Sequence, residues 1–271
     1  MTEPFKDNVV IVTGASSGIG RQLASQLADR GALLALAARD PSRLDAVAAA
    51  CRDRGGAAIA IQTDVTDDQQ CRRLVDRTVH EYGRLDTLIN NAGISMIARF
   101  DDLRDLTLPT RIMNVNYFGC VYCTFYAIPH LKRTRGRIVG ISSLTGLSGV
   151  PMRTVYAASK HAMAGLFDSL RIELMDHGVT VTMAYPDFVE TEVRDRALGA
   201  DGQPVGIYPA REGEFMSAEA CARGIINASA KRKREVIMSF RGRVGNLLKA
   251  VAPGLVDRMA KRAMGKIQET P

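Results

Sequence analysis

The stretch TGASSGIG, residues 13–20, decides the fold. It follows the apolar run NVVIV (8–12) and opens a segment with helical spacing. Glycines at such a place allow a tight turn and let a pyrophosphate approach the backbone N–H groups at a helix N-terminus. A glycine-rich turn often serves turn geometry alone, but its place after the first strand of a βα series favours nucleotide binding. The residues of this turn are Gly14, Ser16, Ser17, Gly18, Ile19 and Gly20.

The same alternation continues along the chain. Apolar β-rich runs occur at 8–13, 32–38, 57–63, 85–90, 136–142 and 179–185, with helical patterns at 18–30, 41–54, 67–82, about 103–132 and 154–177. Continuous apolarity is typical of strands covered on both faces, and alternating β and α elements predict a parallel sheet. We therefore predict one doubly wound α/β domain of Rossmann type over residues 1–240. Its parallel sheet should have about seven strands with helices on both faces, and residues 241–271 should form an extension that is not an independent domain.

The composition fits a soluble globular protein. The chain has 271 residues, of which 46% are hydrophobic and 24% charged, in the ordinary range for that class. The N-terminus lacks the pattern of a signal peptide, and no apolar window reaches the roughly 18 residues of a membrane span. The cysteines are scattered and odd in number, which favours buried thiols, even for the CxxC pair Cys120 and Cys123, and a reducing, cytoplasmic location. We predict no metal site.

The end of the second strand bears on the choice of nucleotide. A carboxylate there would bind the ribose 2′-OH and repel a 2′-phosphate. This strand ends AARD, so the guanidinium of Arg39 is available for a phosphate. NADP(H) is therefore favoured over NAD(H), unless Arg39 is merely solvated and Asp40 turns inward. Asp64, after the third strand, is placed to meet the adenine edge.

A second short stretch, YAASK (156–160), brings a phenol and an ammonium together. Residues four apart on a helix face the same way, and a nearby cation favours the phenolate form of a tyrosine. A Tyr-x-x-x-Lys pair is common by accident, but Ser143 at the end of a strand adds a hydroxyl that could orient a carbonyl or alcohol. Ligand crevices of doubly wound sheets open at such strand ends.

Taken in order, these motifs resemble the short-chain dehydrogenase/reductase family over roughly residues 7–240. The matching segments are TGASSGIG, DV (64–65), NNAG (90–93), the Asn-x-x-Gly of 116–119, SS (142–143) and YAASK. The resemblance implies hydride transfer between a nicotinamide cofactor and an alcohol or carbonyl. Arg39 favours an NADP-preferring type of this family, here with a basic C-terminal extension.

The resemblance also implies roles for individual residues. Tyr156 would be the general acid/base and Ser143 would bind the reacting oxygen of the substrate. Lys160 would bind the nicotinamide ribose, and Asn116 would hold a water in a proton relay. Asn114 is the alternative to Asn116 but has poorer spacing to Gly119. Further cofactor-binding residues would be Val65, Asn91, Ala92, Gly93, Pro186 and Thr191.

One position departs from the family pattern. Many relatives have Pro-Gly after the sixth strand, whereas this chain has Pro186-Asp187, with Thr191 at the expected place. Asp tolerates the left-handed conformation better than most residues, and its carboxylate could instead face the substrate, so its role stays open. His161 is adjacent to Lys160, and adjacent residues do not share a helix face, so we read it as structural.

Several of the residues expected to line the substrate pocket are apolar, and none demands a phosphate or carboxylate on the substrate. These residues are Ser95, Met96, 144–152, Tyr185 and the polar loop 192–216. This favours a hydrophobic secondary alcohol or ketone of steroid, retinoid or fatty type over a soluble polar substrate such as a sugar. The alternatives are a 3-oxoacyl-thioester reductase or a non-catalytic NADP-binding sensor or scaffold on the same fold.

The positive charge is concentrated in the last segment. The net charge is +7 overall, but residues 231–271 carry 11 basic and 3 acidic residues. Apolar residues at helical spacing run from Val244 to Met264, and Pro253-Gly254 predicts a break into two short helices. One interpretation is a peripheral contact with an anionic membrane; the other is packing over the pocket or a sister subunit. We read KRKR (231–234) as a solvated helix end rather than a nucleic-acid site, and expect a homodimer or homotetramer by resemblance.

Overall fold

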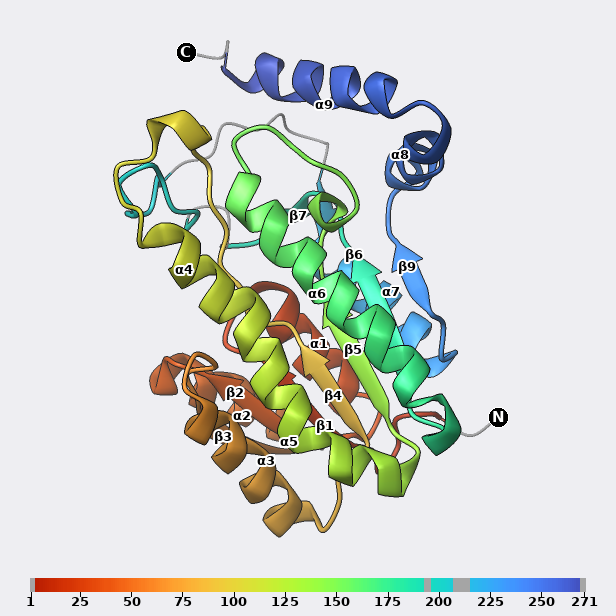
Figure 1. Cartoon of the computed structure of the whole chain (residues 1–271). Coiled ribbons are helices and arrows are strands. Elements are labelled where there is room, and N and C mark those ends of the chain that lie inside the picture. The colour runs from red at the N-terminus through yellow and green to blue at the C-terminus, as the bar shows by residue number, and fades with distance from the viewer. Residues whose placement is uncertain (1–2, 193–195, 207–214, 269–271) are drawn as a thin grey trace.

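A parallel sheet of seven strands lies at the centre of the computed structural model, which describes residues 3–192, 196–206 and 215–268 (Figure 1). The strand order is β3-β2-β1-β4-β5-β6-β9, and every neighbouring pair is parallel. The strands are β1 (Val9–Thr13), β2 (Leu33–Ala38), β3 (Ala57–Gln62), β4 (Thr87–Asn90), β5 (Arg137–Ile141), β6 (Thr180–Tyr185) and β9 (Glu235–Ile237). The predicted single doubly wound domain is confirmed.

Two layers of helices cover the sheet. One layer is α1 (Gly18–Ala28), α2 (Pro41–Asp53) and α7 (Ala218–Ala230); the other is α3 (Asp68–Tyr82), α5 (Gly119–Thr134) and α6 (Thr154–Glu173). Strand β1 shows why both are needed. Val10 and Val12 join the core under the first layer, while Val9 and Ile11 join the core under the second. Because side chains alternate along a strand, a strand that is apolar throughout must be buried on both faces.

Local signals fix several helix ends. Asp40 and Asp67 begin α2 and α3 by accepting hydrogen bonds from the backbone N–H groups of Arg43 and Gln70. Ser217 does the same for α7. Such side-chain caps satisfy N–H groups that have no partner inside the helix. At the other end of α3, Gly83 takes a left-handed conformation with φ 75°, as expected for a helix C-terminus.

The prediction of one long helix over about 103–132 was wrong at its start. The structure has a 3₁₀ turn (Phe100–Asp102), a short α4 (Leu108–Met113), a π-helical turn η2 (Asn114–Phe118) and then α5. The π turn inserts an extra residue into the helix, a feature frequent at functional sites. It contains Asn116, and apolar periodicity alone gives no sign of it.

The six strands expected from sequence are all present, but the seventh was not located in advance. Strand β9 has only three residues and starts with an exposed glutamate at the sheet edge, so it lacks the apolar run that marks the others. Two-residue strands β7 (Val189–Glu190) and β8 (Met216–Ser217) form a separate parallel pair outside this sheet. Next to β1 lie β2 and β4, so the strand order reverses here and a ligand crevice is expected.

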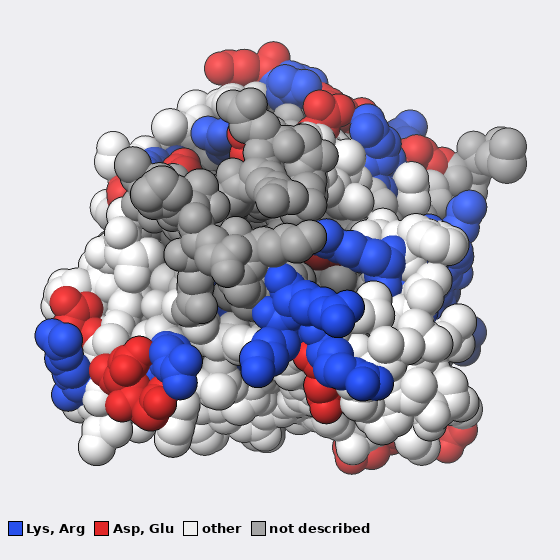
Figure 2. All heavy atoms as spheres, turned by 90° about the horizontal axis from the view of Figure 1, so that it is seen from above, with Lys and Arg blue, Asp and Glu red and all other residues white. Residues whose placement is uncertain are grey.

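The chain ends in two helices, as the Pro253-Gly254 signal predicted: α8 (Phe240–Val251) and α9 (Pro253–Gln268). They lie beyond the carboxyl ends of β5 and β6, with α9 across the top of the view (Figure 1). Figure 2 looks down on this end, and Lys and Arg side chains gather across the middle of the face. The side chains after Arg262, including Met264 and Lys266, lie outside the described residues, as do 193–195 and 207–214 of the predicted polar loop. Among the helices that the structure describes, none is long and apolar enough to cross a membrane.

Candidate active site

A cavity of about 760 Å³ opens at the carboxyl ends of the strands. It is lined by residues that directly follow β1, β2, β3, β4, β5 and β6, together with residues of α6 and of the C-terminal helices. Almost all site residues predicted from sequence line it: Gly14, Ser16, Ser17, Gly18, Ile19, Arg39, Asp64, Val65, Asn91, Ala92, Gly93, Ser143, Tyr156, Lys160, Pro186 and Thr191. Two do not, Gly20 and Asn116.

The glycine turn fits a closely approaching pyrophosphate. Gly14 has φ +64°, and a Cβ there would lie 2.9 Å from the Cα of Ala92. A Cβ on Gly20 would lie 2.1 Å from the carbonyl oxygen of Gly14, so Gly20 permits the turn rather than touching the cavity. Ser17 begins α1 without capping it through its side chain, so the first N–H groups of α1 remain oriented for an anion.

The NNAG segment is tied to this turn. The side-chain amide of Asn91 donates to the carbonyl oxygens of Thr13 (2.9 Å) and Gly14 (3.1 Å). The Thr13 hydroxyl in turn accepts from the backbone N–H groups of Asn91 and Ala92. Asn91 therefore holds the two loops that flank the switch point of the sheet at a fixed separation.

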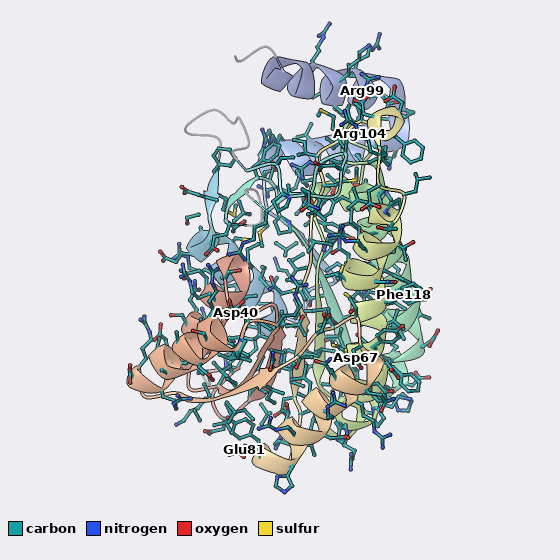
Figure 3. All side chains as sticks on the ribbon, turned by 90° about the vertical axis from the view of Figure 1, so that its left-hand side faces the viewer. Asp40, Asp67, Glu81, Arg99, Arg104 and Phe118 are labelled. Atoms are coloured by element: carbon teal, nitrogen blue, oxygen red, sulfur yellow. The ribbon has the colours of Figure 1, made fainter. Side chains whose placement is uncertain are left out.

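At the adenosine end, Arg39 and Asp40 both line the cavity. The Asp40 carboxylate caps α2 through the N–H of Arg43 at 3.1 Å (Figure 3), and Arg39 is exposed. The sequence did not single out Arg43, whose guanidinium also lines the cavity and lies 2.8 Å from a carboxylate oxygen of Glu192. This hydrogen bond lowers the pKa of Glu192. Two arginines, Arg39 and Arg43, therefore line this end of the cavity.

The phenol and the ammonium of YAASK lie in the same cavity. Both Tyr156 and Lys160 are on α6, and the Lys160 Nζ is 5.8 Å from the centre of the Tyr156 ring. Lys160 is only 3% exposed, and its Nζ donates to the carbonyl oxygen of Ile141 at 2.8 Å. A buried ammonium needs such partners because burial removes its hydration. The observed geometry holds one positive charge beside one phenol at the end of β5.

Ser143 lines the same cavity as this pair, at the start of the 3₁₀ turn η3 (Leu144–Gly146). Its Oγ accepts from the Thr145 N–H at 3.3 Å and lines the cavity. The neighbouring Ser142 also lines the cavity, but its Oγ donates to the Lys160 carbonyl oxygen. The two serines of the SS motif therefore differ in their bonds: the Ser142 hydroxyl donates to α6, whereas the Ser143 hydroxyl accepts from its own turn.

Asn116 lies behind the cavity and is fully buried. Its Oδ1 accepts from the Ile94 N–H at 2.8 Å, while its Nδ2 donates to the Ile94 carbonyl oxygen and to the Ser159 hydroxyl. Ser159 in turn donates to the carbonyl oxygen of Tyr156. Asn116 thus joins the loop after β4 to α6, the helix that carries Tyr156 and Lys160. Its proposed role in a proton relay stays a prediction.

The substrate side is less well predicted. Ser95, Leu144 and Val150 line the cavity as expected. Met96 and Tyr185, however, do not line the cavity, so the prediction for these two residues was wrong. Both are buried in the cores. Burial also raises the pKa of Tyr185 to about 12. A side chain next to a strand end can point to either face, and the direction depends on packing that the sequence does not display.

Arg153 was also missed by sequence reasoning. It precedes α6, lines the cavity and donates to the Ser95 hydroxyl at 2.5 Å. Leu198, in the predicted polar loop, is held next to this region by backbone hydrogen bonds to Ser95 and Ile97. His161 is exposed and bonds the carbonyl oxygen of Ala157 on its own helix, as its structural interpretation required.

Two further sequence features have structural explanations. All five cysteines are buried thiols, and burial raises the pKa of Cys120 to about 12. Within KRKR, Arg232 donates to three backbone carbonyl oxygens, those of Arg135, Gly136 and Gly178. The motif therefore follows the end of α7, as expected. Arg232 is not merely solvated, however, because its bonds hold the loop before β9 in place.

Asp187 follows β6 and meets a residue far away in sequence. Its carboxylate accepts two hydrogen bonds from the guanidinium of Arg241 on α8, at 2.6 and 2.8 Å. Ser239 donates a third at 2.6 Å. The sequence could show that Asp187 departs from the family pattern, but not that its partner lies 54 residues later.

Comparisons with known proteins agree with this site. Residues 8–200 match the family model for short chain dehydrogenases. The chain is 40% identical to the 11-beta-hydroxysteroid dehydrogenase-like 4A of Arabidopsis thaliana, over 96% of this chain and 86% of that protein. It is 36% identical to the dehydrogenase/reductase SDR family protein 7-like of Dictyostelium discoideum, over 93% and 80%.

A solved structure has the same architecture. The short chain dehydrogenase/reductase of Burkholderia phymatum in complex with NAD is similar with a TM-score of 0.82 and 25% identity, over 93% of this chain and 96% of that one. The ordered glycine turn, the Ser143–Tyr156–Lys160 arrangement and these matches lead to one conclusion. The chain belongs to the short-chain dehydrogenase/reductase family.

Proposed function

We propose that this protein transfers a hydride between NADP(H) and a hydrophobic secondary alcohol or ketone, with Tyr156 as general acid/base. As a member of its family it is an oxidoreductase that acts on hydroxyl or keto groups with a nicotinamide cofactor. The observation that carries the finer proposal is the shared cavity, in which Ser143, Tyr156 and the buried Lys160 stand beside the glycine turn.

The residues of the site divide the work of the reaction. The Ser143 hydroxyl would hold the reacting oxygen of the substrate, and in reduction the Tyr156 hydroxyl would give its proton to that oxygen. Lys160, held by the Ile141 carbonyl oxygen, would stabilise the negative charge left on the phenolic oxygen. When bound, the nicotinamide would supply the hydride to the carbonyl carbon. Positioned proton transfer of this kind contributes about 10²–10⁴ in rate.

The preference for NADP(H) is supported by Arg39 and Arg43, which line the adenosine end. The carboxylate of Asp40, which could oppose a 2′-phosphate, is engaged as the cap of α2. The hydrophobic class of substrate is supported by Ile94, Leu144, Val150 and Phe188 on the cavity wall. Curated relatives named hydroxysteroid dehydrogenases point the same way.

The test is a cofactor-oxidation screen with NADPH and NADH across carbonyl compounds graded in size and polarity. We expect faster oxidation of NADPH than of NADH, and a higher kcat/KM for large apolar ketones than for small polar ones. Binding of NADPH without turnover of any carbonyl compound would favour the non-catalytic sensor instead.

A further inference from the structure

We infer that Asp187 is a positioning residue that fastens the C-terminal helices α8 and α9 over the cavity, making them the outer wall of the substrate site. We call the group Asp187, Ser239 and Arg241 the clasp. The link to substrate rests on the proposed function, whereas the fastening itself does not.

The Asp187 carboxylate is committed to the clasp. Oδ2 accepts from the Ser239 hydroxyl and Arg241 Nε, and Oδ1 accepts from Arg241 Nη2 and the Phe188 N–H. A carboxylate has about four acceptor positions, so these four bonds leave none for a substrate. Asp187 therefore has a structural role, and its carboxylate does not face the substrate.

Because the Asp187 carboxylate is largely buried, it depends on the hydrogen bonds from Arg241 and Ser239. The Asp187 side chain is 11% exposed, and the Arg241 side chain is 51% exposed. Burial alone would raise the pKa of Asp187, but the hydrogen bonds from Arg241 and Ser239 outweigh it, and the pKa lies below its ordinary value. A charge buried to this extent needs its partner, since leaving it unpaired is costly. Arg241 also lies over the ring of Phe188, with its Cζ 5.3 Å from the ring centre.

The clasp sets the beginning of α8. The Ser239 hydroxyl that donates to Asp187 also accepts from the Gly242 N–H at 3.0 Å and so caps the helix. Gly242 then packs closely on the loop after Ser143, where a Cβ at position 242 would lie 2.5 Å from the Leu144 side chain. Further along α8, the Lys249 Nζ donates to the Leu147 carbonyl oxygen at 2.5 Å. Helix α8 therefore contacts the loop after Ser143 at two places, Leu144 and Leu147.

The consequence is a cavity that the C-terminal helices help to enclose. Arg241 of α8 and Ala260 of α9 line it together with Phe188 and Leu144. In Figure 1 these helices lie across the end of the molecule onto which the carboxyl ends of the strands open. The wall that they add lies against Leu144 and Leu147, so it should bear on large substrates rather than on the cofactor.

The experiment compares the wild type with Asp187→Asn, Arg241→Ala and the exchanged pair Asp187→Arg/Arg241→Asp. The first readout is hydrogen–deuterium exchange over residues 240–262, with NADPH bound. We expect about tenfold faster exchange at the start of α8 in both single variants, the factor associated with losing one charge-assisted hydrogen bond, and partial recovery in the exchanged pair.

The second readout is KM and kcat for a large and a small apolar ketone. We expect KM to rise more for the large ketone than for the small one, and kcat to change less than KM.

Arg223→Ala is the matched control, because Arg223 forms an ion pair with Glu219 on α7 at a similar exposure, 56%, and lies outside the cavity lining. Unchanged exchange at α8 in both single variants, or equal rises in KM for the two ketones, would overturn the inference. If Asp187→Asn fails to fold, Arg241→Ala decides. A wild type that reduces no ketone would refute the proposed function. The exchange data would still test whether the clasp fastens α8.

Discussion

At the scale of single residues, Tyr156 carries the sharpest expectation. Its hydroxyl is the group that would exchange a proton with the substrate, and Lys160 lies 5.8 Å from its ring centre. Replacing Tyr156 by Phe removes the hydroxyl and keeps the ring. We expect kcat to fall about 10²–10⁴-fold, the usual contribution of positioned proton transfer, while the Kd for NADPH changes little. Turnover kinetics and a binding titration measure the two effects, and undiminished turnover would exclude the assigned role.

Arg39 is the second residue whose charge can be tested directly. It is exposed at the end of β2 and lines the adenosine end of the cavity. Arg39→Asp reverses the charge that would meet a 2′-phosphate, so we expect the kcat/KM ratio of NADPH to NADH to fall by at least about tenfold, in line with one lost charge-assisted contact. Lys132→Asp on the distant end of α5 is the control for a general change in charge. An unaltered ratio in Arg39→Asp would mean that Arg39 does not select the cofactor.

These residues also mark how far the sequence can predict the site. The glycine turn, Ser143, Tyr156 and Lys160 follow strand ends or share a helix face, so their meeting is a consequence of local geometry. Asp187 and Arg241 meet only because the chain returns over the cavity after β9. Such a contact depends on tertiary packing, which no spacing rule encodes.

At the scale of elements, the long apolar strands were predictable and the short or irregular elements were not. The runs that became β1 and β2 are fully or almost fully buried, and burial on both faces requires the continuous apolarity that reveals them. Strand β9 has three residues at an edge, and the π turn η2 contains ordinary helix-forming periodicity. Both are fixed by their neighbours: β9 by pairing with β6, and η2 by the Asn116 bonds to Ile94 and Ser159.

The attachment of α8 should depend on pH in a known direction. The pKa of Asp187 is lower in the folded protein than its ordinary value, so its stabilising contribution is complete above that ordinary value, about 3.9. It is lost as the pH falls through the lower, folded pKa. We therefore expect the difference in Tm between the wild type and Asp187→Asn to be constant from about pH 8 to pH 5 and to shrink below about pH 4. Thermal melts followed by circular dichroism measure it, and a difference that shrinks at neutral pH would contradict the assignment.

At the scale of the whole molecule, one cavity collects residues from Gly14 to Ala260. The cofactor side comes from loops that the βα repeat brings to one edge of the sheet, and the substrate side from segments added later in the chain. This division explains why the family and the cofactor class are readable from motifs, whereas the substrate is not. The proposed substrate wall consists of Arg153, Phe188 and the C-terminal helices, whose positions follow from packing.

The outer surface of α5 and α6 leads to a last prediction, that two copies associate through this face. Phe125 is 69% exposed, Phe118 points outward from the same helical layer two turns earlier (Figure 3), and Ile172 near the end of α6 is 71% exposed. Large apolar side chains gathered on one face mark interaction sites, and a dimer axis places the same patch on both partners. We expect the wild type to elute as a dimer or tetramer in size-exclusion chromatography with light scattering. Phe125→Asp should weaken association about 30-fold or more, the range of a central aromatic contact, whereas Leu106→Asp, at a 78% exposed site before α4, should not. A monomeric wild type at micromolar concentration, or equal effects of the two variants, would show that this face is not the interface.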